Sequence, residues 1–160
     1  MRTQRILVPC IAALALLCSC QHAAPTPDWQ SDENAYTDTV LALQNEVVAE
    51  VDTFFLAFAD SLLSPSTSFL QLDSVLKRNL QKLKDLPDFQ NDNRIKQGSI
   101  SVCMSISQLC QQSFREMLSL DSALALQYDE QLQNRFDSLS EETFNQILQA
   151  QQKLDDLLPE

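Results

Sequence analysis

Histidine, the side chain that most often holds metals and moves protons in enzymes, occurs once in this chain of 160 residues, as His22. A ferritin-type metal site needs Glu-x-x-His pairs on two helices, and a c-type haem needs Cys-x-x-Cys-His; the sequence has neither. The acidic segment 88–99 partly matches a calcium-binding loop, but Asn93 stands at the turn glycine and Ser99 at the closing glutamate. We therefore expect no metal ion and no other cofactor.

Carboxylate pairs such as Glu46 with Glu50 and Glu141 with Glu142 are the remaining groups for acid–base catalysis. They lie off the apolar stripes of the helices described below, which is typical of a solvent-exposed face. The chain has a single glycine, Gly98, so it contains neither a glycine-flanked serine nucleophile nor a glycine-rich phosphate loop. We expect a protein that is not an enzyme.

Cys103 and Cys110 are the only cysteines after position 20. On one helix, seven residues rise about 10.5 Å, which exceeds the roughly 7 Å between Cα atoms that a disulfide allows. The two thiols cannot bridge each other, and we expect them to be free and buried as small apolar groups. A disulfide to a second copy, giving a homodimer, is the alternative.

A phenylalanine cluster and a basic cluster are the other candidate sites. Phe54, Phe55 and Phe58 lie in a segment, 53–60, that would be apolar on every side of a helix. Simple burial is the favoured interpretation, and an apolar partner or ligand is the alternative. Four cations lie within eight residues, where they either face anionic lipid head groups or, as we favour, offset neighbouring acidic helices: Lys77, Arg78, Lys82 and Lys84.

The N-terminus has the pattern of a secretory signal peptide. Residues 1–5 carry two arginines and no acid, and residues 6–17 form a twelve-residue apolar run interrupted only by Pro9 and Cys10. Twelve residues make about 18 Å of helix, which is short of the roughly 30 Å hydrocarbon core of a bilayer. We expect this segment to be removed and not to remain as a membrane span.

The apolar run closes with Leu17-Cys18-Ser19-Cys20. This motif resembles the lipobox of bacterial lipoproteins, in which the final cysteine becomes the new N-terminus. The resemblance implies that residues 1–19 are the signal peptide and that Cys20 receives a diacylglycerol and a fatty acid such as palmitate, which anchor the chain in the lipid bilayer. An ordinary signal peptide cut near Ala23 or Ala24 is the alternative.

The residue after the lipidated cysteine bears on the location of the chain. In enteric lipoproteins, which this motif resembles, an aspartate there marks retention in the inner membrane, whereas this chain has Gln21. The resemblance thus implies the outer membrane, with the rest of the chain in the periplasm or on the cell surface.

Residues 20–30 contain two prolines and no helical or strand period, so they predict an extended tether of at most about 33 Å. Residues 31–160 predict an all-α domain, an antiparallel up-down bundle of about four amphipathic helices. The expected helices end at Ser64–Pro65, at Pro87 and at Leu120–Asp121, with Asp121 as an N-cap. The stripe of the first runs through Val40, Leu43, Val47, Val51, Phe54, Phe58 and Leu62.

Two questions about helix boundaries stay open at this level. Asn91 and Asp92 offer caps for the third helix, which begins near Ile95 or, because glycine costs a helix interior about 1 kcal/mol, after Gly98 at Ser99. For residues 121–158 we favour one long helix with a kink near Ser140. A capping box at Ser138 favours two helices instead.

The charge of the chain limits the classes of partner. The net charge is −11, and without Arg2 and Arg5 of the signal segment, 9 basic residues face 22 acidic ones, a difference of −13. Nucleic acids need clustered cations, so a basic protein surface fits better. We expect a non-catalytic envelope adaptor, or an inhibitor or immunity protein against a cationic partner. The alternative is a carrier of a small apolar ligand or lipid, which needs an enclosed cavity of some 300 Å³.

Overall fold

The computed structural model describes residues 32–60, 62–90 and 92–158. The signal segment, Cys20, His22, the tether and Asn91 lie outside these ranges. The described residues form five helices and no strand: α1 (Glu33–Leu56), α2 (Pro65–Asp85), α3 (Arg94–Gln111), α4 (Ser113–Leu126) and α5 (Glu130–Asp155). No helix within these ranges has the length and apolar content needed to cross a membrane.

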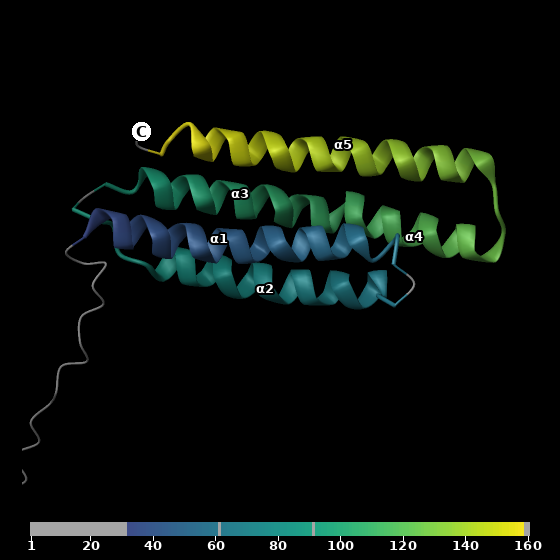
Figure 1. Ribbon diagram of the computed structural model, residues 1–160, viewed down its shortest axis with the longest axis horizontal. Coiled ribbons are helices and arrows are strands. Elements are labelled where there is room, and N and C mark those ends of the chain that lie inside the picture. The colour runs from purple at the N-terminus through teal and green to yellow at the C-terminus, as the bar shows by residue number, and fades with distance from the viewer. Residues whose placement is uncertain (1–31, 61, 91, 159–160) are drawn as a thin grey trace, which may run out of the picture.

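Successive helices run in opposite directions, except that α4 continues in the direction of α3 (Figure 1). α3 and α4 form two parts of one broken rod, so the chain makes an up-down bundle of four rods: α1, α2, α3–α4 and α5. This confirms the predicted all-α antiparallel bundle. The start of α1 and the end of α5 lie at the same end of the molecule.

Polar caps fix where three helices begin. Asp32 accepts the N–H of Asn34 at 2.9 Å at the start of α1. Ser64 accepts the N–H of Thr67 at 3.3 Å, with Pro65 in the first turn of α2, as predicted. Asp129 accepts the N–H groups of the first turn of α5 at 2.8 and 3.2 Å.

The predicted end of the first helix was wrong. α1 stops at Leu56, and the backbone then turns. The Asp60 carboxylate accepts the N–H of Leu62 at 2.9 Å, a local bond that competes with continuation of the helix. Leu62 is consequently 91% exposed and does not belong to the apolar stripe.

The predicted break at Leu120–Asp121 was also wrong. The rod breaks earlier, at Gln112, whose φ of −117° and ψ of −81° are not helical, and α4 then continues to Leu126. Asp129 takes the capping role that was assigned to Asp121. The prediction of one helix over residues 121–158 was wrong as well, because α4 ends at Leu126 and α5 begins at Glu130. α5 itself runs uninterrupted through Ser138 and Ser140, so the capping box at Ser138 does not start a helix.

The core lies between α1, α2 and the α3–α4 rod. Each fully buried aliphatic or aromatic side chain there stabilises the fold by roughly 1.5–3 kcal/mol. Twelve side chains are the largest of those that are less than 2% exposed: Phe54, Phe114, Leu72, Leu76, Leu83, Ile106, Met117, Val40, Val47, Val51, Val75 and Val102.

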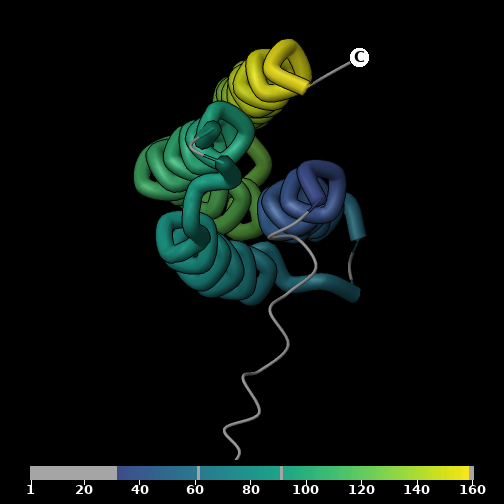
Figure 2. The backbone as a smooth tube through the Cα atoms, turned by 90° about the vertical axis from the view of Figure 1, so that its left-hand side faces the viewer, coloured from purple at the N-terminus to yellow at the C-terminus, as the bar shows by residue number. Residues whose placement is uncertain are grey.

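α5 lies at the edge of the bundle. Among the described residues its backbone packs against α3 and α4, and not against α1 or α2. Figure 2, which looks along the bundle, shows α5 beside the α3–α4 rod, at the opposite edge of the molecule from α2. The side of the bundle between α1 and α5 is thus left without a backbone contact.

The single glycine explains how α5 approaches α3. A Cβ atom added at Gly98 would come 2.7 Å from Leu154 Cδ1 and 2.9 Å from Leu157 Cδ1. Gly98 lies inside α3, which begins at Arg94, so the alternative start at Ser99 is wrong. The glycine is needed for close packing of two helices and not as a helix terminus.

Candidate functional site

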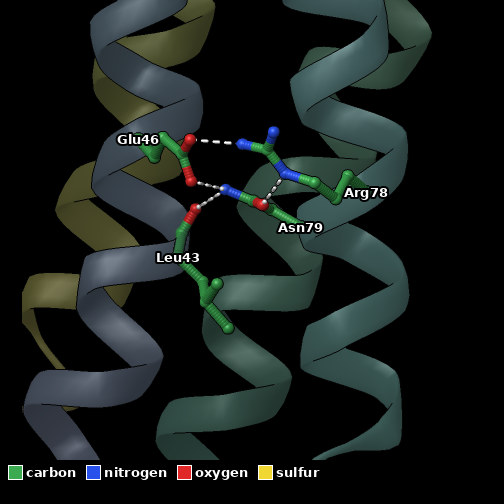
Figure 3. Close-up of polar contacts among 4 residues, drawn as sticks. All are labelled: Leu43, Glu46, Arg78 and Asn79. Atoms are coloured by element: carbon green, nitrogen blue, oxygen red, sulfur yellow. Dashed lines mark hydrogen bonds and ion pairs between the residues drawn. The ribbon is translucent and has the colours of Figure 1, made fainter.

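The candidate carboxylate Glu46 and the candidate cation Arg78 belong to one polar network between α1 and α2 (Figure 3). The fully buried Asn79 donates from Nδ2 to Glu46 Oε2 at 2.7 Å and to the Leu43 carbonyl at 2.9 Å. Arg78 donates from Nε to Asn79 Oδ1 at 3.1 Å and forms an ion pair with Glu46. The hydrogen bond from Asn79 and the Arg78 cation lower the pKa of Glu46. The network therefore fixes the register of the two helices.

The other cations of the basic cluster are distributed over two sides of α2. Lys77 pairs with Asp73 one turn earlier at 2.6 Å. Lys82 lies near Glu46 and, like Arg78, lowers its pKa. Lys84 is exposed. At least three of the four cations thus stand beside acidic groups of α1 or α2, in line with the interpretation that they offset acidic neighbours.

The remaining candidate carboxylates lie on two different helices, α1 and α5. Glu50 is half-buried on α1, while Glu141 and Glu142 are exposed on α5. Glu142 accepts a hydrogen bond from Gln146 at 3.2 Å and lines a groove between α3 and α5. Within the described ranges, no group of three or more His, Cys, Asp or Glu side chains is arranged to hold a metal ion.

The three candidate phenylalanines join α1 to the rest of the bundle. Phe54 is fully buried, and its ring centroid lies 4.6 Å from that of Phe114 and 5.0 Å from that of Phe58. Phe55 and Phe58 are half-buried and contact rings of α5, at 6.0 Å from Phe144 and 5.0 Å from Phe136. Other phenylalanine rings thus occupy the space beside Phe54.

The two candidate thiols are buried in α3. Cys103 and Cys110 are free, at 0% and 3% exposure. Burial raises the pKa of Cys103 to about 11 and that of Cys110 to about 12. Both groups are therefore protonated at neutral pH and shielded from oxidants and from a second chain.

A groove between α1 and α5 is the surface feature that the sequence did not reveal. We name it the α1–α5 groove. It encloses about 500 Å³ and is lined by Leu41, Gln44, Asn45, Leu148, Gln151, Gln152, Leu154, Asp155 and Leu158. The contact between Phe55 and Phe144 joins the same two helices farther along.

Exposed apolar side chains lie along this groove. Leu148 is 45% exposed and Phe144, one turn earlier on the same face of α5, is 44% exposed. On α1, Leu41, Val48 and Phe55 recur every seven residues, so they share one helix face, and all three are partly buried. The sequence analysis did not single out these rows, and it did not indicate that α5 stands away from α1.

The groove carries acidic charge and no cation. α1 contains no lysine or arginine, and Asp155 lines the groove from α5. The two cations of α5 lie elsewhere, Lys153 in the groove with α3 and Arg135 in an ion pair with Glu116 of α4. The lining is therefore mainly leucine and amide, with one carboxylate, that of Asp155.

Comparison with known proteins finds no family model, no curated protein and no solved structure that matches the chain. The proposed function therefore rests on the α1–α5 groove and on the N-terminal motif. This combination can bind a surface that is both apolar and basic.

Proposed function

We propose that the chain is a lipid-anchored protein of the bacterial envelope that acts by binding a partner with a basic surface, as an adaptor or as an inhibitor of the immunity type. The lipobox is the observation that carries the location. Two or three acyl chains on Cys20 would hold the chain durably at a bilayer, because each buried methylene contributes about 0.8 kcal/mol. The identity of Gln21 favours the outer membrane, with the helical part facing the periplasm or the cell surface.

The α1–α5 groove supports a function by contact. Exposed apolar side chains next to one another mark interaction surfaces more often than isolated ones do. The net charge of −13 without the signal segment, from 9 basic and 22 acidic residues, favours cationic partners by steering their approach.

A carrier of a small apolar ligand is the second candidate function. It would use the space near Phe54, Phe55 and Phe58. The ring of Phe54 is packed against Phe114 and Phe58, and the α1–α5 groove lies at the surface between helices. Contact with a partner is therefore the function that the geometry supports better.

Metabolic labelling with palmitate tests the anchor. Wild type should incorporate the label and Cys20→Ala should not. Cys18→Ala is the matched control, because it alters the neighbouring cysteine of the same motif and should keep the label. Equal labelling of wild type and Cys20→Ala contradicts the anchor. A separate experiment, crosslinking in the intact envelope, tests whether the chain contacts a basic protein.

A further inference from the structure

We propose that the α1–α5 groove is a docking site for an amphipathic helix with basic flanking residues, contributed by a partner protein. This inference rests on the proposed binding function and specifies the surface and the kind of partner. Three observations carry it: the position of α5, the spacing of the apolar side chains and the sign of the charge.

The position of α5 leaves a surface groove between α5 and α1. α5 packs on α3 and α4 and makes no backbone contact with α1, so the bundle is open between α1 and α5. At one end the Phe55–Phe144 contact joins α1 to α5. Beyond it the two helices are separated by a groove of about 500 Å³ that includes Leu41 and Leu148.

The apolar side chains have the spacing that a docked helix requires. From Leu41 through Val48 to Phe55 there are 14 residue steps along α1, which correspond to about 21 Å or four helical turns. Phe144 and Leu148 form a second row on α5 and are almost half exposed. A helix with apolar residues at positions i, i+3, i+4 and i+7 would place its apolar stripe over the open part of these rows, on the Leu41 and Leu148 side of the Phe55–Phe144 contact.

The charge specifies the flanks of that helix. Asp155 lines the groove, Asp52 is exposed one turn from Val48, and α1 has no cation at all. Lysine or arginine beside the apolar stripe of the partner would meet these carboxylates. A second copy of the chain would bring the same excess of acidic residues on α1 and α5, so charge disfavours it as the occupant.

A synthetic helix serves as the probe. We use a fluorescent peptide of about 18 residues, roughly 27 Å long, with leucine at helical spacing and lysine elsewhere, and measure anisotropy on adding the chain of residues 20–160. A peptide with glutamate in place of lysine is the control. We expect binding of the lysine peptide only, and weaker binding at high salt because the charges are exposed.

Matched variants locate the binding. Leu148→Ser should weaken binding about tenfold, whereas Leu70→Ser, which removes a more exposed leucine on α2, should change it less than about twofold. Asp155→Lys should weaken binding at least about fivefold and Glu142→Lys less than about twofold. Both acidic residues are exposed on α5 and both variants change the charge equally, but Glu142 lines the groove on the other side of the helix. Circular dichroism establishes that each variant is folded.

Several outcomes overturn the inference. Equal effects of Asp155→Lys and Glu142→Lys would mean unspecific attraction by an acidic protein. A dimer in sedimentation that Leu148→Ser dissociates would make a second copy the occupant. Tighter peptide binding after removal of residues 20–30 would make the tether of the chain itself the occupant.

Crosslinking in the envelope separates this inference from the proposed function. If a basic partner is captured equally by wild type and by Leu148→Ser, the adaptor function stands and the groove is not its site. If the peptide binds in the groove but Cys20→Ala is labelled like wild type, the groove stands and the lipid anchor fails.

Discussion

Lys96 donates from its Nζ atom to the backbone carbonyl of Leu86 at 2.9 Å and so connects the start of α3 with the end of α2. The lysine is 7% exposed, and its ammonium group also pairs with Asp88. In the same loop, the Tyr36 hydroxyl donates to the Pro87 carbonyl at 3.0 Å. The loop after α2 is therefore held by side chains of α1 and α3.

Replacing this lysine should destabilise the protein. Lys96→Met leaves the Leu86 carbonyl and Asp88 without their donor, and we expect the free energy of unfolding to fall by about 2 kcal/mol. Urea unfolding monitored by circular dichroism measures this change. Lys84→Met, at an exposed site on α2, is the control and should change stability by less than about 0.5 kcal/mol. Equal effects would show that Lys96 does not hold the loop.

The Glu46–Asn79 network should make stability depend on acidity. Asn79 and Arg78 lower the pKa of Glu46, so the folded state binds its proton more weakly than the unfolded state does. The contribution of Glu46 is complete above its ordinary pKa of 4.5 and is lost as the pH falls towards the lower folded value. Glu46→Gln should therefore be less stable than wild type near neutral pH, and the difference should shrink on acidification.

Unfolding at several pH values tests this dependence. Glu142→Gln is the control, because Glu142 makes only a hydrogen bond within its own helix. A constant difference between wild type and Glu46→Gln from neutral to acidic pH would contradict the assignment.

The thiols should be unreactive in the folded protein. Since burial raises the pKa of Cys103 to about 11 and of Cys110 to about 12, almost no thiolate is present at neutral pH. We expect modification by a thiol reagent only at the rate of unfolding, and rapid modification of both in denaturant. On non-reducing electrophoresis the chain of residues 21–160, which lacks Cys20, should run at its single mass. A thiol-sensitive band of doubled mass would support the disulfide-linked homodimer instead.

Gly98→Ala should lower stability although alanine is the better helix former. Its Cβ atom would come 2.7 Å from Leu154 Cδ1, and Leu154 is only 2% exposed, so the side chain has little room to move. We expect this overpacking to outweigh the propensity gain of about 1 kcal/mol and to leave a net loss of about 1 kcal/mol. Thermal unfolding measures the change.

A double variant shows where the cost of Gly98→Ala arises. The added loss should be smaller in a Leu157→Ala background, because the second close contact, at 2.9 Å, is then removed. Ser101→Ala, at an exposed site of α3, should not lower stability. A more stable Gly98→Ala protein would contradict the close approach of α5.

Local signals in the sequence predicted the fold class and part of its boundaries. Ser64 followed by Pro65 marks a helix start through interactions that involve only residues 64–67. The structure has this helix start where it was predicted. Asp121 and Asp129 have the same capping chemistry. The apolar period continues past Asp121 into Leu124, so the choice between them depends on packing in the folded chain.

The candidate site depended on contacts between distant segments. The sequence shows that α1 lacks cations and that Phe144 and Leu148 share a face. It does not show that α5 packs on α3 at Gly98 and leaves a groove beside α1, because Gly98 and Leu154 are distant in the chain. The buried position of Lys96 has no local signature either, since lysine at that spacing is equally compatible with an exposed face.

The break at Gln112 gives α5 a mechanical role. Leu154 holds α5 to α3 on one side of the break, and the ion pair of Arg135 with Glu116 holds it to α4 on the other. α5 thus bridges the break between α3 and α4 and holds the two helices in line. Detaching α5 would remove both contacts across the break at once, so α3 and α4 should then change their angle to one another while their core side chains stay packed on α1 and α2.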